Sequence, residues 1–239
     1  MKILVDTHTH TNASTHAFST LAENVSEARK RGIDMICMTD HTPALPDAPH
    51  IWHFRTLMRL PRVIDGVKLV FGAETNIIDK NGNIDLPQYD LKNMEIVIAS
   101  IHHPCYASGT LEEHTRTYMG AIKNPYVTII GHSGNPDFEY DIDTVVKCAK
   151  EYNKCIEINN SSFKSRPKNL ENCRKIASAC KKYGTNVVIG SDAHSAYEVG
   201  VFDNAIKLLE DIDFPEELVM NTDMEKFESY LRSFGRYKG

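Results

Sequence analysis

Histidines are concentrated near the start of the chain. His8 and His10 are two residues apart and directly follow the apolar run at residues 3–5. If this run is a β-strand, its two-residue period places both imidazoles on the same side of the extended chain. Two imidazoles that converge from the end of one strand can bind a single metal ion. The opening stretch therefore predicts one side of a metal site.

Short, apolar and β-prone runs recur along the rest of the chain, and most are bounded by polar or turn residues. They cover residues 2–6, 35–39, 68–74, 96–101, 127–131, 155–159 and 186–190. Most lack a clean alternation of apolar and polar residues, as expected for strands that are buried on both faces. They follow one another at intervals of about 30 residues, which is the size of one βαβ unit.

Helical periodicity fills several of the gaps between these runs. Apolar residues recur every three or four positions in residues 20–31, 141–152 and 168–183, and again in 199–211 and 223–234. The sequence Lys80-Asn81-Gly82, within residues 76–86, is typical of a hairpin turn. Strands that alternate with helices predict a parallel sheet, either open or closed into a barrel.

The residues that follow the predicted strands favour the closed form. Six of the seven strand ends carry a side chain that can bind a metal ion, and together they supply His8, His10, His16, His41, Glu74, His102, His132, Asp192 and His194. Parallel strands place their C-terminal ends on one side, and a barrel brings these ends together around a single mouth. We therefore predict an α/β fold in which seven strands form a (β/α)7 barrel.

The nine candidate ligands all offer nitrogen or oxygen. Such a set suits Zn²⁺, Mn²⁺ or Fe²⁺ better than a sulfur-rich structural site does. Nine ligands are too many for one ion, so two or three ions are implied. Glu74 is the only glutamate at these strand ends, and its two oxygens make it the natural bridge between ions.

Composition limits the remaining possibilities. A net charge of −5 argues against stable binding to nucleic acid, whose phosphates attract Lys and Arg. The apolar run at the start of the chain is too short for a signal peptide, and an acidic residue follows it too early. No apolar run approaches the ~20 residues that span a bilayer.

The six cysteines form no Cys-x-x-Cys pair and are expected to be reduced core thiols. We expect one domain over residues 1–239 in the cytoplasm, while the oligomeric state stays open.

The motifs resemble those of the PHP (polymerase and histidinol phosphatase) family, and most closely those of its YcdX-like branch of small stand-alone proteins. The likeness extends over essentially the whole chain. It rests on residues 6–10 (DTHTH), 39–41 (TDH), 72–74 (GAE), 102 (H), 131–132 (GH), 159–162 (NNSS) and 190–194 (GSDAH). The resemblance implies a distorted, TIM-barrel-like barrel of seven strands with a trinuclear metal centre.

The resemblance also implies how the ligands are shared. One ion would be bound by His8, His10, Glu74 and Asp192, a second by His16, His41 and His194, and a third by Glu74, His102 and His132. Glu74 would then bridge two ions. The nine positions show no departure from the family pattern, so a metal-free member is not expected. The cofactors would be three divalent ions, Zn²⁺ in the first place and Mn²⁺ or Fe²⁺ otherwise.

These features lead to a hypothesis about the reaction. Clustered divalent ions lower the pKa of bound water and neutralise the charge of a phosphoryl group. We expect a phosphatase that hydrolyses a small phosphomonoester by attack of a metal-bridging hydroxide, without a covalent enzyme intermediate. Glu74 and Asp192 would be catalytic through the ions that they bind.

Five further residues receive roles that the sequence leaves open. His103 is a candidate to protonate the leaving group, with a water molecule or a metal ion as the alternatives. Arg166 and Ser161 follow the sixth strand and are candidates for substrate binding, although Arg166 can equally be a solvated loop residue. Asp6 and Asp40 are expected to orient neighbouring imidazoles, with capping of the strand ends as the alternative.

Three other functions stay open. An amidohydrolase-like enzyme also begins with His-x-His and ends with a late aspartate, but His16, His41 and His194 would be surplus in it. A 3′–5′ nuclease is a second alternative, which the acidic net charge disfavours. The third is a protein without catalytic activity that keeps the metal ions for stability.

Overall fold

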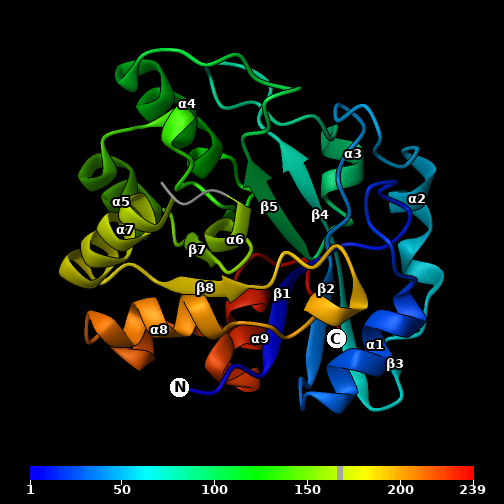
Figure 1. The fold of residues 1–239 in the computed structure, drawn as a ribbon. Coiled ribbons are helices and arrows are strands. Elements are labelled where there is room, and N and C mark those ends of the chain that lie inside the picture. The colour runs from blue at the N-terminus through cyan, green and yellow to red at the C-terminus, as the bar shows by residue number, and fades with distance from the viewer. Residues whose placement is uncertain (166–168) are drawn as a thin grey trace.

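A nearly closed barrel of parallel strands, with alternating helices, forms the centre of the molecule (Figure 1). The computed structural model describes residues 1–165 and 169–239. Within these residues the barrel has seven parallel strands, which lie in chain order as β1 (Val5–Thr9), β2 (Met35–Met38), β4 (Val67–Asn76), β5 (Ile96–Ser100), β6 (Ile129–Ile130), β7 (Cys155–Asn159) and β8 (Val187–Gly190). The short strand β3 (Val63–Ile64) pairs antiparallel with β4 outside this order. The predicted (β/α)7 barrel is confirmed.

The seam between β1 and β8 is closed in two different ways. At the C-terminal end of the strands, Thr9 and Ala193 form a parallel bridge, and the Asp192 amide donates to the His8 carbonyl at 2.9 Å. Farther down, Asn221 fills the gap between the two strands. Its amide nitrogen donates to the carbonyls of Val5 at 2.8 Å and Ile189 at 2.7 Å, and its oxygen accepts from the Ile189 amide at 3.1 Å. The Asn221 side chain thus supplies hydrogen bonds that β1 and β8 would otherwise exchange with each other as neighbouring strands.

Helices and short turns connect the strands. The α-helices are α1 (Leu21–Lys30), α2 (Trp52–Thr56), α3 (Gln88–Leu91), α4 (Leu111–Lys123), α5 (Ile142–Glu151), α6 (Ser162–Ser165), α7 (Asn169–Tyr183), α8 (Asp203–Asp211) and α9 (Met224–Arg232). Short 3-10 helices lie at Leu57–Arg59, Pro136–Phe138, Ala196–Glu198, Glu216–Leu218 and Met220–Thr222. Within the described part of the chain, no helix has both the length and the apolar character needed to cross a membrane.

The barrel interior is apolar, and α9 covers its lower end. Side chains from alternate strand positions, such as Val5, Ile96 and Cys155, form one buried cluster with Phe227 and Leu231 of α9 (red in Figure 1). Tyr230 of the same helix donates its hydroxyl to the Thr128 carbonyl and accepts from the Cys155 amide at 3.1 Å. Because α9 seals the N-terminal ends of the strands, only their C-terminal ends can form an open site.

The secondary structure follows the sequence closely, apart from the long helix α4 and the short elements α2, α3, α6 and β3, which were not predicted. The five predicted helices are present within a few residues of their expected bounds, apart from residue 168, which lies outside the described residues. The turn at residues 80–82 is present, because Gly82 has a φ of +77° and Ile77 and Ile84 form an antiparallel bridge. Helix α4 was not predicted, although Thr110 and Glu113 form a capping box at its start. All six cysteines are free, and five of them are buried as expected for core thiols, whereas Cys105 is partly exposed.

Candidate metal centre

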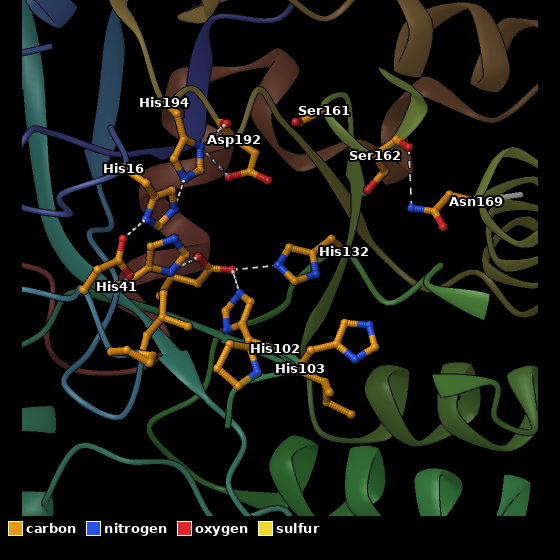
Figure 2. A pocket seen from close by; sticks show the side chains of 16 residues that line it. His16, His41, His102, His103, His132, Ser161, Ser162, Asn169, Asp192 and His194 are labelled. Carbon is orange, nitrogen blue, oxygen red and sulfur yellow. Dashed lines mark hydrogen bonds and ion pairs between the residues drawn. The ribbon is translucent and has the colours of Figure 1, made fainter. Parts of the chain in front are cut away.

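Glu74 lies at the middle of the histidine cluster. It is a residue of β4, and its side chain is fully buried. One carboxylate oxygen, Oε1, lies 2.8 Å from His132 Nε2 and 3.3 Å from His102 Nε2. The other oxygen, Oε2, lies 2.8 Å from His41 Nδ1 and 3.3 Å from His8 Nε2. Four imidazoles from different strand ends thus meet one carboxylate, and Figure 2 shows three of them around the cavity.

Asp192 forms a second point of convergence. Its Oδ1 lies 3.2 Å from His10 Nε2, 3.5 Å from His8 Nε2 and 3.6 Å from His194 Nδ1. Asp192 has a φ of +55°, an uncommon conformation for a residue other than glycine. Its other oxygen accepts a hydrogen bond from Asn159 Nδ2 at 3.2 Å. The aspartate after β8 is therefore held toward the histidines of β1.

The cluster becomes more exposed toward His16. His16 Nε2 lies 2.9 Å from His194 Nε2, and the His16 ring stacks on the His41 ring at a centroid distance of 4.9 Å. The His16 side chain is 43% exposed and that of His194 is 24% exposed, whereas the His8 and His10 side chains are fully buried. The structure thus brings all nine candidate ligands together. Their role as ligands stays a prediction.

Several buried atoms in this cluster lack a hydrogen-bond partner among the described residues. They include His8 Nε2, His10 Nε2, His41 Nδ1 and Glu74 Oε2, which approach one another without hydrogen-bond geometry. An unsatisfied buried polar group costs about 1–3 kcal/mol, so such a gathering needs an additional binding partner. A cation bound between these atoms would satisfy all of them.

The same atoms form sets that fit metal ions. Over the residues that the structure describes, three sets have ligand atoms that all lie within 4.8 Å of one another, and these are His8 with His10 and Glu74, His10 with His41 and His194, and His41 with Glu74 and His102. Imidazole nitrogens and carboxylate oxygens are ligands for divalent Zn, Mn and Fe. The residues present therefore fit divalent metal ions.

Hydrogen bonds fix which ring nitrogen of several histidines faces the cluster. His8 Nδ1 lies 2.7 Å from Glu157 Oε1, and His102 Nδ1 lies 2.6 Å from Asn76 Oδ1. His16 Nδ1 lies 2.5 Å from Asp47 Oδ2. In each case the Nε2 atom is left free to bind an ion. Sequence reasoning missed these three partners, although Glu157 lies on the same strand face as Asn159 and could have been found by alternation.

The expected role of Asp6 is wrong. Its carboxylate accepts hydrogen bonds from the backbone amides of Ser191 at 3.1 Å and Gly200 at 2.8 Å, and burial raises its pKa to about 6. These bonds fasten the loop after β8 to β1, which is the capping alternative. Asp40 does contact an imidazole, but it is that of His53, at 3.0 Å, which lies outside the nine candidates.

The ionisation of Glu74 and His10 suits cation binding, whereas the carboxylates of Glu157, Glu74 and Asp192 outweigh burial and hold the pKa of His8 well above its usual range. Burial raises the pKa of Glu74, but His8, His102 and His41 outweigh it and hold that pKa well below its usual range. Burial and the neighbouring His41 lower the pKa of His10 to about 3. At neutral pH the carboxylate is therefore ionised and the His10 imidazole is neutral, and these are the forms that bind metal.

A cavity of about 460 Å³ opens over the cluster. His103 and Ser161 line it together with Ser162 and Asn169 (Figure 2). The His103 side chain is half exposed, and its Nε2 lies 3.1 Å from Asp137 Oδ2. Arg166, the other candidate for substrate binding, lies outside the described residues. The cavity therefore places His103 and Ser161 near the candidate ligands, and their roles stay predictions.

Two family models match this chain. Residues 6–161 match the PHP domain, and residues 171–222 match a PHP-associated domain. A protein of Acetivibrio thermocellus named probable phosphatase is 50% identical over 232 residues, which cover 97% of this chain and 96% of that protein. Another probable phosphatase, from Caldanaerobacter subterraneus, is 51% identical over 234 residues, which cover 97% of this chain and 92% of that protein.

The fold is also similar to that of solved structures. Histidinol phosphate phosphatase from Lactococcus lactis, in complex with zinc, L-histidinol and phosphate, superposes with a TM-score of 0.65. The similarity covers 90% of this chain and 95% of that chain, at 19% identity. At this level of identity the comparison shows a common fold.

Proposed function

The chain belongs to the PHP family and is a phosphatase, and on that premise we propose that it hydrolyses a small phosphomonoester at a centre of three divalent metal ions. One observation carries this proposal. Buried, unpartnered atoms of His8, His10, His41 and Glu74 converge beneath a cavity of about 460 Å³. A cavity of this volume suits a small molecule.

The proposed ions are distributed over the nine side chains of the cluster. One would be bound by His8, His10, Glu74 and Asp192, another by His16, His41 and His194, and the third by Glu74, His102 and His132. Zn²⁺ is the first choice, and Mn²⁺ and Fe²⁺ are alternatives. When bound, such ions supply a water nucleophile at neutral pH and neutralise the charge of a phosphoryl group.

The chain's own residues would do the remaining work. Glu74 and Asp192 are ionised at neutral pH, because the nearby histidines hold the pKa of each carboxyl well below its usual range despite burial. Asp137 holds Nε2 of His103, so Nδ1 of that ring is the nitrogen that can deliver a proton to the leaving-group oxygen. Ser161 would hydrogen-bond to the substrate in the cavity.

Further parts of the proposal concern the whole chain. We propose one domain over residues 1–239, because β8 pairs with β7 and α9 packs into the barrel that both strands complete. Six free cysteines favour a reducing compartment, and we propose the cytoplasm. A net charge of −5 disfavours stable binding to nucleic acid.

The decisive experiment is a substrate screen with defined metal content. The purified protein is stripped with a chelator, loaded with Zn²⁺, Mn²⁺ or Fe²⁺, and assayed with p-nitrophenyl phosphate and a panel of phosphorylated metabolites. We expect metal-dependent release of phosphate from small phosphomonoesters.

The same preparation is assayed with lactones, amides and a labelled single-stranded oligonucleotide. Turnover of one of these substrates without turnover of any phosphomonoester would contradict the proposal. Loaded protein that hydrolyses nothing would instead favour a role of the ions in stability.

A further inference from the structure

Glu157 is a buried carboxylate of β7 that lies beneath the candidate metal centre. Its side chain is fully buried. Oε1 accepts a hydrogen bond from His8 Nδ1 at 2.7 Å, and Oε2 accepts one from the backbone amide of His132 at 2.8 Å. Oε2 also accepts from Asn159 Nδ2 at 3.1 Å, and the same Asn159 nitrogen donates to Asp192 Oδ2 at 3.2 Å. One carboxylate therefore contacts two predicted ligands directly and a third through Asn159.

Gly190 allows Glu157 to reach His8. Strand β8 lies between β7 and β1, so the two residues are not on neighbouring strands. Gly190 occupies the intervening position on β8. A Cβ atom there would lie 2.2 Å from Glu157 Oε1 and 2.8 Å from His8 Cβ. The contact between Glu157 and His8 therefore requires a residue without a side chain at position 190.

The contact with His8 selects one tautomer of its ring. A neutral imidazole that donates through Nδ1 carries no proton on Nε2, which is then free to bind a cation. His8 Nε2 faces Glu74 Oε2 at 3.3 Å and Asp192 Oδ1 at 3.5 Å. The hydrogen bond that His8 Nδ1 donates to Glu157 thus presents Nε2, the correct nitrogen, to the cluster.

The contact with His132 supports an unusual backbone conformation. His132 has a φ of +23°, which residues with a side chain rarely adopt and which must be maintained by the surrounding structure. Its backbone amide donates to Glu157 Oε2, while its Nε2 lies 2.8 Å from Glu74 Oε1. The same carboxylate therefore supports the backbone from which the His132 ring reaches Glu74.

We propose that Glu157 is a positioning residue that sets the His8 tautomer and the His132 backbone, so that both rings present Nε2 to the metal ions. The inference rests on the proposed function, because it requires a centre that binds metal. Carboxylates that accept from metal-binding histidines typically affect metal affinity or activity by about 10- to 100-fold.

Glu157→Gln tests this role with little change in shape. If the glutamine oxygen faces His8, its NH₂ group opposes the donors of His132 and Asn159. If the oxygen faces those donors, the NH₂ group meets His8 Nδ1, which must then accept, and the proton moves to Nε2. Either arrangement disturbs one of the two ligands.

The measurements are zinc content after dialysis, the rate of zinc release to a chromogenic chelator, and kcat and KM for p-nitrophenyl phosphate. For Glu157→Gln we expect weaker retention of zinc, release that is about 10- to 100-fold faster, and a lower kcat with a smaller change in KM. Gly190→Ala should change zinc release in the same direction although residue 157 itself is unchanged, because the added Cβ would displace the Glu157 carboxylate.

Glu95→Gln is a matched control. Glu95 is also buried, and it precedes β5 at the opposite end of the strands, where it accepts from Arg62 at 2.5 and 2.9 Å. This variant should lose thermal stability but release zinc at the wild-type rate.

Two outcomes would overturn the inference in different ways. If Glu157→Gln retains zinc, releases it and turns over substrate as the wild type does, the positioning role is wrong, even if its Tm falls. If the wild-type protein itself binds no metal, the proposed function fails, and the inference fails with it.

Discussion

His132 Nε2 lies 2.8 Å from Glu74 Oε1, although 58 positions separate these residues in the chain. The other oxygen of the same carboxylate faces His41 at 2.8 Å and His8 at 3.3 Å. The two oxygens therefore divide the surrounding imidazoles into two groups. A carboxylate placed in this way can bridge two cations, and the first prediction tests this bridge.

Replacement of Glu74 by alanine should remove metal and activity together. The variant should bind fewer equivalents of metal, and its turnover of p-nitrophenyl phosphate should fall by more than the about 100-fold that a residue orienting a ligand contributes. Elemental analysis and steady-state kinetics check both results. Glu171→Ala, at an exposed position of α7, is the control. If metal content and turnover both survive in Glu74→Ala, the bridging role is wrong.

His103 can be tested through the leaving group of the substrate. An alkyl phosphate needs a proton on its departing oxygen, whereas p-nitrophenolate departs without one. His103→Asn should therefore lower kcat for an alkyl phosphate by about 100-fold and leave p-nitrophenyl phosphate much less affected. Asp137→Asn should show a smaller change of the same kind, because Asp137 orients the ring. An equal loss on both substrates would rule out proton delivery by His103.

Asn221 should be important for stability. Its side chain is fully buried and makes three hydrogen bonds to the backbone of Val5 and Ile189. Asn221→Leu leaves these backbone groups unsatisfied, so the free energy of unfolding should fall by about 3 kcal/mol or more. Urea denaturation measures this change. Asn93→Leu, which loses one bond at a half-buried site, should cost far less, and equal stability of the two variants would contradict this account.

The lowered pKa of the buried Lys154 amine predicts that the stability of the protein depends on pH. Burial lowers its pKa from 10.5 to about 8, while its ammonium group donates to the Val127 carbonyl at 2.6 Å. Between these pH values the unfolded chain binds this proton and the folded chain does not, so this contribution to stability rises with pH.

The comparison is between the wild type and Lys154→Met in chemical denaturation at pH 7.5, 8.5 and 9.5. The unfolding free energy of the wild type, minus that of the variant, should increase across this series because only the wild type carries the titrating amine. A constant or decreasing difference would show that the pKa of Lys154 is not lowered in the folded protein.

The barrel and its histidine cluster were predictable because they follow from local signals. Each strand is a short apolar run, and each candidate ligand stands at or just beyond the end of such a run. Once parallel strands are assumed, topology alone brings His8, Glu74 and His132 to one mouth. The count of these apolar runs then made seven the expected number of strands.

The parts that were missed depend on contacts across the fold. Glu157 lies inside a buried strand, and its importance arises only because Gly190 leaves space for it to reach His8. Asp6 lies two residues before His8 in the sequence, yet its oxygens face the amides of Ser191 and Gly200, which a distant loop brings to them. The partners of Asp6 have no signature in the local sequence, and for Glu157 the only local signal is the alternation that places it on the same strand face as Asn159.

The seam at Asn221 also means that the barrel can close only late during synthesis of the protein, after β8 and Asn221 have been made. β1 leaves the ribosome well before β8 and Asn221, because Asn221 follows Val5 by 216 positions in the chain. Until then the nascent sheet has an unpaired edge, a surface on which other chains can pair. A chaperone that binds the growing chain would therefore meet an open sheet. The edge of β1 is covered only after β8 and Asn221 have been synthesised, so we expect the chaperone to leave the chain after that point.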